Sequence, residues 1–408
     1  MLPRPLRTLL NATTRDGSLV DVGIDGATVV GVAPAVGRPA AADDELDLRG
    51  FVLLPAPADA HAHVDKSRTW EAAKAPLGDL VMAVESYHAF SDAETEEGIA
   101  QRARETLREM LMWGTTAVRS HVNIRRGDDP LRGVRAMLCL REEFEGLMDL
   151  ELVSLSDHTT SDEVIEEAIA AGLDLVGGAP HLAPDPRFEL HRLLDIAERL
   201  GVGVDLHTDE ALSGDETITE FARRVRGWGV NVAAGHCVRL GTMPHEELGP
   251  IVADIVASDL AIITLPITNL YLQGWDDPVS TPRGLTALRR LIDAGARLGA
   301  GADNVRDPFN PLGRCDALET VALLVTAGHL SIDEAYDLAS NGSRRVMRLP
   351  EAGVFPGAAA ELLAIRGGSL DEVAATAHPE RIVIHRGAIV ARSEFRATIA
   401  AARAGVTA

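Results

Sequence analysis

The 408-residue sequence predicts an α/β fold: a (β/α)8 TIM-type barrel with a small β-sandwich formed by the N- and C-terminal segments. Short apolar runs alternate with longer amphipathic segments through the middle of the chain. Short β-rich runs, separated by Gly and Asp, occupy both ends. A doubly wound open sheet would also alternate, but no Gly-rich phosphate loop follows the first apolar run, so the barrel is favoured.

The middle of the chain supplies the expected barrel. Eight apolar runs are predicted to be its strands: 51–55, 115–122, 149–156, 173–179, 202–206, 230–234, 259–265 and 296–301. Segments with helical periodicity lie between them, for example 94–112, 161–171, 187–200, 215–228 and 283–295. This alternation is typical of a closed parallel barrel with an outer ring of helices.

The two ends of the chain have similar residue patterns. The runs 19–24 and 28–32 resemble the runs 360–365 and 382–387, with turn residues between them. We therefore expect residues 1–56 and 346–408 to pair in one small β domain. Residues 57–345 would then form the catalytic barrel as a continuous insert.

Composition narrows the class of partner. The net charge of −22 argues against nucleic acid and anionic membranes, which need a basic footprint. No apolar run approaches the roughly 20 residues that span a bilayer, and the first residues lack the apolar core of a signal peptide. Three scattered cysteines fit a reduced, cytoplasmic setting. A small-molecule substrate is the expected partner.

Histidines mark the expected functional end of the barrel. His61 and His63 flank one residue, and a strand sends residues i and i+2 to the same side, so both imidazoles can converge on one metal ion. The alternative is a pair of satisfied polar residues at a strand end. Seven of the 13 histidines fall where predicted strands end: His61, His63, His121, His158, His181, His207 and His236. Because barrel chemistry sits at those ends, this enrichment favours a metal site.

Six motifs occur in a fixed order across nearly the whole chain. They are Asp-Ala-His-Ala-His-Val-Asp-Lys at 59–66, Ser-His-Val at 120–122, Val-Gly-Gly-Ala-Pro-His at 176–181, Asp-Leu-His-Thr-Asp-Glu at 205–210, Asn-Leu-Tyr-Leu-Gln-Gly at 269–274 and Gly-Ala-Asp-Asn-Val-Arg-Asp-Pro-Phe at 301–309. With them the sequence resembles the amidohydrolase superfamily, and within it the cytosine deaminase-like branch. The resemblance implies a hydrolase of non-peptide C–N bonds, with a homo-oligomer as a possible assembly.

The resemblance also implies one divalent metal ion, Zn(II) or Fe(II), held by His61, His63, His207 and Asp303. Imidazole and carboxylate ligands suit both ions, so the choice stays open. Two-metal relatives bridge their ions with a carboxylated lysine at the end of the fourth strand. The only lysines here, Lys66 and Lys74, lie far from residues 173–181, which favours a single ion.

The implied reaction is hydrolytic deamination of a cytosine-like amino-heterocycle, either a pyrimidine, a triazine or a cyclic amidine. Metal-activated hydroxide would attack the carbon that bears the exocyclic amino group. Glu210 would shuttle protons, Asp303 would accept a proton from water, and His236 would steady the hydroxide. A solvated acid, a helix cap and a core histidine are the respective structural alternatives.

The chain departs from cytosine deaminases around the substrate. Asp157 stands where they have a glutamine, Asn304 where they have an acid and Phe309 where they have a tryptophan. An ionised aspartate only accepts hydrogen bonds, so a substrate edge with N–H groups is favoured over a bare carbonyl. The reaction is thus better defined than the substrate, and a heterocycle other than cytosine is expected.

Other residues keep two interpretations. His181, like His121, is expected either to contact substrate or to support the metal ligands. Gln273 lies in a loop region with Trp70, Tyr271 and Trp275, which could cover a planar ring or simply lie on the surface. Lys66 is expected to act at the site or to form a salt bridge with Asp65 or another acid at the barrel mouth.

Two further functions stay open. An amidohydrolase of the same fold could instead cleave a cyclic amide or an N-alkylamino group. A silent homologue could bind a heterocycle without turnover, but it would be expected to lack Glu210 or Asp303, and both are present.

Overall fold

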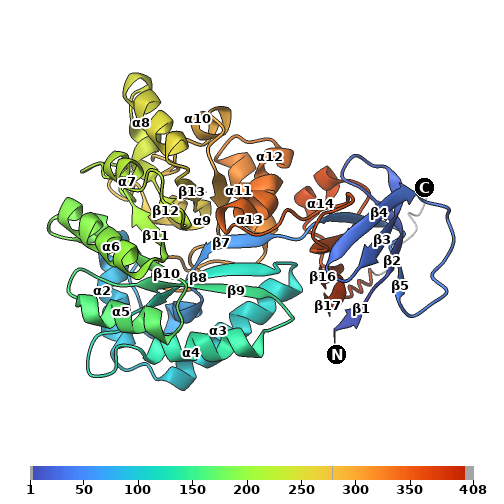
Figure 1. Cartoon of the computed structure of the whole chain (residues 1–408), viewed down its shortest axis with the longest axis horizontal. Coiled ribbons are helices and arrows are strands. Elements are labelled where there is room, and N and C mark those ends of the chain that lie inside the picture. The colour runs from blue at the N-terminus through green and yellow to red at the C-terminus, as the bar shows by residue number, and fades with distance from the viewer. Residues whose placement is uncertain (1–2, 278, 400–408) are drawn as a thin grey trace, which may run out of the picture.

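The computed structural model describes residues 3–277 and 279–399; residues 400–408, the end of the predicted small domain, lie outside it. It confirms the α/β barrel with an additional sheet (Figure 1). Eight parallel strands form the barrel in chain order: β7 (Ala58–Ala62), β8 (Ala117–Asn123), β9 (Asp149–Leu155), β10 (Leu175–Gly178), β11 (Gly203–Thr208), β12 (Val232–His236), β13 (Ala261–Thr264) and β14 (Leu298–Ala300).

Helices connect the strands and surround the barrel (Figure 1). They include α3 (Glu96–Met112), α4 (Arg132–Glu143), α5 (Asp162–Ala171), α6 (Pro186–Leu200), α7 (Ile218–Arg224), α8 (His245–Ala257), α10 (Leu288–Asp293), α11 (Ala317–Thr326) and α12 (Ile332–Asp337). Among the described residues, no helix has the length and apolar character needed to cross a membrane.

Local sequence signals set the ends of these helices. The Asp185 side chain accepts a hydrogen bond from the Phe188 amide at the start of α6, and Pro186 occupies its first turn. Gly201 then ends α6 with a φ of 69°. The remaining helical segments are η1 (Val64–Lys66), α1 (Trp70–Ala73), α2 (Leu80–Ser91), η2 (Pro180–Leu182), η3 (Val238–Thr242), α9 (Pro266–Leu272), η4 (Leu338–Gly342), α13 (Ser343–Val346) and α14 (Leu370–Thr376).

The small sheet joins the two ends of the chain, as expected. Its nine connected strands are β1 (Arg4–Pro5), β2 (Thr8–Thr13), β3 (Leu19–Asp25), β4 (Thr28–Pro34), β5 (Glu45–Asp47), β6 (Phe51–Pro55), β15 (Leu362–Arg366), β16 (Arg381–His385) and β17 (Ala388–Arg392). β6 pairs antiparallel with β15, which links the N-terminal strands to the C-terminal ones.

The prediction that residues 51–55 form the first barrel strand is wrong. This run is β6 of the small sheet, and the barrel begins with β7. Pro55 is the last residue of β6 and Pro57 lies between β6 and β7. Proline has no N–H for a strand ladder, so the chain leaves one sheet before it enters the other. His61 therefore lies within the first barrel strand, and His63 directly follows it.

Backbone hydrogen bonds close the barrel between its first strand and the segment after its last strand. The His63 amide donates to the Asp303 carbonyl, and the Asp303 amide donates to the His61 carbonyl, both at 2.9 Å. Gly301 makes this approach possible, because a Cβ atom there would lie 2.4 Å from the His61 carbonyl oxygen. We call this contact the barrel seam.

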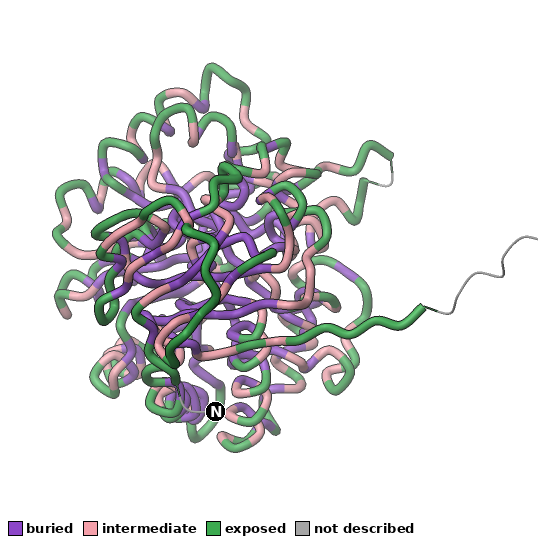
Figure 2. The backbone as a smooth tube through the Cα atoms, turned by 90° about the vertical axis from the view of Figure 1, so that its right-hand side faces the viewer, coloured by how far each residue is buried: buried purple, intermediate pink, exposed green. Residues whose placement is uncertain are grey.

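Burial is concentrated in the barrel strands, while the outer faces of the helices are exposed (Figure 2). Inside the barrel, the fully buried Arg119 on β8 donates to Asp205 on β11 at 2.8 Å and to Glu151 on β9 at 2.6 Å. A buried guanidinium needs such partners, because an uncompensated charge in the core is costly.

Gly301→Ala is expected to destabilise the protein by about 1–3 kcal/mol, because the added methyl group must push the seam apart. Urea unfolding followed by circular dichroism measures this loss. The matched control is Gly249→Ala in α8, where a Cβ meets no described atom within 4 Å and alanine is the better helix former. Equal stability of the two variants would contradict this view of the seam.

Candidate metal centre and active site

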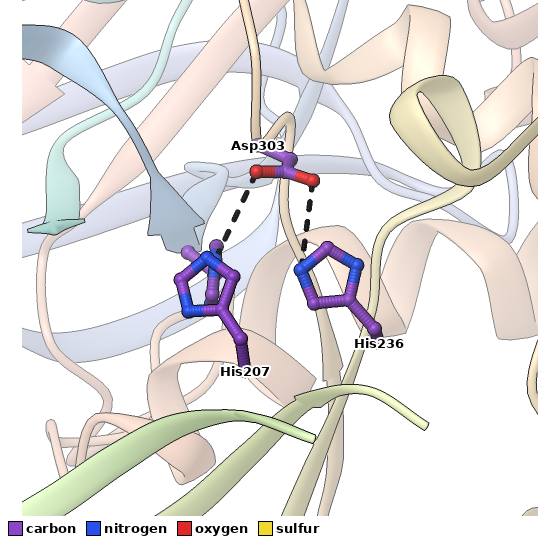
Figure 3. Close-up of side chains that lie close together, drawn as sticks. His207, His236 and Asp303 are labelled. Carbon is purple, nitrogen blue, oxygen red and sulfur yellow. Dashed lines mark ion pairs between the residues drawn. The ribbon is translucent and has the colours of Figure 1, made fainter. Parts of the chain in front are cut away.

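Four histidines and one aspartate meet at the carboxyl ends of the barrel strands. His61 and His63 come from β7 and its end, His207 from β11, His236 from the end of β12 and Asp303 from the segment after β14. The His63 Nε2 atom lies 3.0 Å from His207 Nε2 and 3.1 Å from Asp303 Oδ1. Figure 3 shows the Asp303 carboxylate facing the His236 ring, with His207 beside it.

This cluster could hold a metal ion. Ligand atoms that bind one ion at about 2.1 Å lie about 3–3.5 Å from one another. His61, His207, His236 and Asp303 each offer a ligand atom within 4.8 Å of the others. His63 contacts two members of this group, His207 and Asp303. Both Asp303 carboxylate oxygens and His61 Nε2 are buried without a hydrogen-bond partner among the described residues. A cation is the partner that such atoms lack.

The imidazoles are held in the form that binds metal. Burial lowers the pKa of His61, with a further contribution from His121. Burial also places the pKa of His63 and of His207 well below the usual range. These rings are therefore neutral near pH 7, with a lone pair available for coordination.

The backbone is strained where two of these side chains enter the site. Asp303 has a φ of 57° and His236 a φ of 66°, in the left-handed region that non-glycine residues seldom adopt. Such a conformation costs about 1–3 kcal/mol and persists only where surrounding contacts enforce it. At Asp303 the enforcing contacts are the hydrogen bonds of the barrel seam.

Glu210 lies next to the cluster and is buried. Its carboxylate oxygens lie 3.4 Å from His181 Nε2 and 3.4 Å from His236 Nδ1. Burial alone would raise the pKa of Glu210, but His236 and His181 outweigh it, so the pKa falls below the ordinary value. The carboxylate is therefore ionised and able to accept a proton.

Two predicted substrate residues support Glu210 instead of lining the cavity. The Gln273 amide donates to the Glu210 carbonyl oxygen at 2.7 Å, and His181 Nδ1 lies 3.2 Å from the His207 carbonyl oxygen. For His181, the structure favours the supporting interpretation over direct substrate contact. Tyr271 and Trp275 meet edge to face, and neither lines the cavity.

Two residues that orient the histidines had no role assigned from the sequence. Asn269 Nδ2 lies 2.9 Å from His236 Nδ1, and Asp205 Oδ1 lies 3.8 Å from His61 Nδ1 and 3.6 Å from His121 Nε2. These contacts leave the Nε2 atoms of His61 and His236 directed at Asp303. Asp205 lies two residues before His207 on one strand, so a period of two could have identified it.

A cavity of about 110 Å³ opens beside the cluster. An engineered cavity of about 150 Å³ holds benzene, so this one has the scale of a small ring. Its lining includes His63, His207, Glu210, His236 and Asp303, and the predicted Asp157, Asn304 and Phe309. Lys66 and Asn123 also line it, together with Leu80, Val84, Tyr87 and His88 of α2.

The polar groups of Asp157 are already engaged by the protein. One carboxylate oxygen accepts hydrogen bonds from Thr159, and the other accepts one from Arg126 at 3.1 Å. Burial raises the pKa of Asp157, but these hydrogen bonds outweigh it, so the pKa lies below its usual range. Asp157 is thus a charged but paired wall of the cavity.

Asn304 is held in place within the wall. Its Nδ2 atom donates to Asp307 at 2.8 Å, and its Oδ1 atom lies 3.3 Å from the Thr268 hydroxyl. Burial raises the pKa of Asp307 to about 7, and Lys66 opposes that shift. The side chain of Asn304 is therefore presented to the cavity in a fixed orientation.

Comparisons with known proteins agree with this geometry. The model of the amidohydrolase family matches residues 144–391, more than half of the chain. Pterin deaminase of Rhizobium rhizogenes is 27% identical over 391 residues, which cover 91% of this chain and 88% of that protein. N-isopropylammelide isopropyl amidohydrolase of Pseudomonas sp. strain ADP is 24% identical over 399 residues, covering 92% and 94%.

A solved structure shares the fold over nearly its full length. The 5-methylcytosine deaminase of Klebsiella pneumoniae, crystallised with phosphonocytosine, superposes with a TM-score of 0.86 at 24% sequence identity. The match covers 96% of this chain and 100% of that one. On the extent of the family match, with a barrel and a histidine–aspartate cluster that agree with it, this chain belongs to the amidohydrolase family.

Proposed function

We propose that this protein is a metal-dependent hydrolytic deaminase of a cytosine-like amino-heterocycle, which it converts to the oxo compound with release of ammonia. The observation that carries the proposal is the buried group of neutral imidazoles around the unpartnered Asp303 carboxylate, with the ionised Glu210 beside it. The names of two relatives, a pterin deaminase and a 5-methylcytosine deaminase, describe the same type of reaction.

His61, His63, His207 and Asp303 would hold the metal ion, either zinc or iron. When bound, a divalent ion supplies hydroxide at neutral pH by lowering the pKa of water. His236 is left beside the ligands, with Nδ1 facing Asn269 and Nε2 facing Asp303. It would donate a hydrogen bond to the oxygen that attacks the ring.

Glu210 would move the protons. Its ionised carboxylate can take a proton released from water and deliver it to the ring nitrogen next to the amino-bearing carbon. A second transfer would protonate the leaving amino group, so that ammonia departs and the ring carbonyl forms. The contacts with His181 and Gln273 would keep this carboxylate aimed at the substrate.

The cavity supports a flat ring as substrate. Phe309 and Tyr87 provide aromatic surfaces, and Leu80, Val84 and Ile124 provide apolar ones. Asn304 and Asn123 offer amide groups for the polar edges of a heterocycle. A cavity lined by apolar and aromatic side chains with a few amide groups favours a planar ligand with polar edges.

A substrate panel tests the proposal. The zinc-loaded and iron-loaded proteins are incubated with cytosine, isocytosine, 5-substituted cytosines, creatinine, aminotriazines and pterin, and ammonia and organic products are measured. Ammonia with the matching oxo compound supports deamination. Release of an alkylamine, or a ring-opened product without ammonia, would favour the alternative cleavage of an N-alkylamino group or a cyclic amide.

Glu210→Gln should keep its metal ion and lose about 10²- to 10⁴-fold in kcat, because the isosteric amide cannot shuttle protons. Ammonia release and metal content are measured on the same preparation. The exposed Glu246→Gln in α8 serves as the matched control and should behave like the parent protein. Normal turnover by Glu210→Gln would remove this residue from the mechanism.

The purified protein should retain about one metal ion per chain, because the proposed ligands His61, His63, His207 and Asp303 surround one position. His207→Asn should weaken retention by at least about 10- to 100-fold, the loss typical of disturbing even an outer partner of a ligand. Atomic emission spectroscopy after dialysis measures the bound ion. His245→Asn, at the exposed start of α8, is the control. Full metal content in His207→Asn would refute the ligand assignment.

A further inference from the structure

One charged group in the cavity has no role in the proposed reaction. Lys66 belongs to η1, directly after the first barrel strand, and only 4% of its surface is exposed. Its Nζ atom lies 3.9 Å from the centre of the Phe309 ring and 5.8 Å from the centre of the Tyr87 ring. All three residues line the cavity that also contains Glu210 and Asp303.

Two neighbouring acids, Asp65 and Asp307, accept hydrogen bonds from groups other than Lys66. The alternative expected for Lys66 is a salt bridge with Asp65 or another acid at the barrel mouth. Asp65 Oδ2 accepts from Arg125 at 2.9 Å, and Asp65 Oδ1 is buried without a hydrogen-bond partner among the described residues. One Asp307 oxygen accepts from the Asn304 side chain, and the other from backbone amides. Within residues 3–277 and 279–399, no carboxylate lies within ion-pair distance of the ammonium group of Lys66.

A buried cation without an anion is costly, and a cation–π contact offsets only part of the lost hydration. Here the ammonium group faces the space that the substrate would fill. An anionic oxygen on the substrate would accept a charge-assisted hydrogen bond from this ammonium group and balance its charge. The Phe309 ring below it fixes the position at which this oxygen must arrive.

We propose that Lys66 selects amino-heterocycles that carry an anionic oxygen, either an ionised ring oxygen or a ring carboxylate. The inference rests on the proposed function in taking a heterocycle as the occupant. It assigns the ammonium group to recognition, whereas Glu210 and His236 act at the amino-bearing carbon. The substrate class is thereby narrowed from neutral cytosine-like rings to anionic ones.

The binding of rings that resemble the product tests the proposed role of Lys66 without requiring turnover. Calorimetry on the metal-loaded protein compares uracil, which is neutral, with barbiturate, which has an ionised ring oxygen, and orotate, which has a ring carboxylate. The parent protein should bind at least one anion about 10- to 100-fold more tightly than uracil. Barbiturate and orotate distinguish the two sources of charge.

Variants separate recognition from folding. Lys66→Met keeps the stem on Phe309 and should lose the anion preference while retaining metal and native circular dichroism. Lys66→Arg keeps the charge and should restore part of the preference. Lys74→Met removes the only other lysine, which is exposed, and should bind like the parent.

The outcomes are distinct. An anion preference that persists in Lys66→Met, as direct coordination to the metal ion would produce, overturns the inference. So does a parent protein that binds no anion more tightly than uracil, or that binds none of the three rings. If the preference depends on Lys66 but no heterocycle yields ammonia, the inference stands and the proposed function fails. If ammonia is released without any anion preference, the proposed function stands and the inference fails.

Discussion

The barrel seam is the contact on which the rest of the site depends. Two backbone hydrogen bonds hold Asp303 against residues 61 and 63, although some 240 residues separate them along the chain. The same bonds that close the cylinder therefore bring the carboxylate to the paired imidazoles. Gly301 allows the close approach, and the left-handed backbone at Asp303 turns its side chain inward. The contact that closes the barrel therefore also brings together residues of the candidate metal site.

Next to the candidate metal site, a buried carboxylate compensates a buried arginine and contacts two histidines. Asp205 lies between the Arg119 guanidinium and the rings of His61 and His121. The carboxylate balances the buried arginine and faces Nδ1 of His61, which leaves Nε2 toward Asp303. Desolvation keeps the rings neutral, and the orphaned carboxylate of Asp303 supplies the negative charge that a cation would balance. An unpaired buried carboxylate destabilises the fold, and binding of a cation would offset this unfavourable free energy.

The reaction and the substrate are handled by different parts of the chain. Groups proposed to act on the amino-bearing carbon come from the ends of barrel strands, whose positions the sheet fixes. Much of the remaining wall comes from η1 and α2, which belong to the long connection between β7 and β8. Family membership therefore supports the type of chemistry more firmly than the choice of ring. The buried ammonium group of Lys66 at that wall is the feature that we propose selects an anionic ring.

The sequence alone determined the order of strands and helices, because alternation, periodicity and helix caps are local properties. It also indicated the histidines and Glu210, since their motifs follow predicted strands. It could not place β6 in the small sheet, from which the chain passes through Pro55 and Pro57 into the barrel, nor α2 beside the cavity. The partners of Asp157, Lys66, Gln273 and Asn269 were likewise beyond it. These contacts join residues that are far apart in the sequence, so only tertiary packing decides which side chains meet.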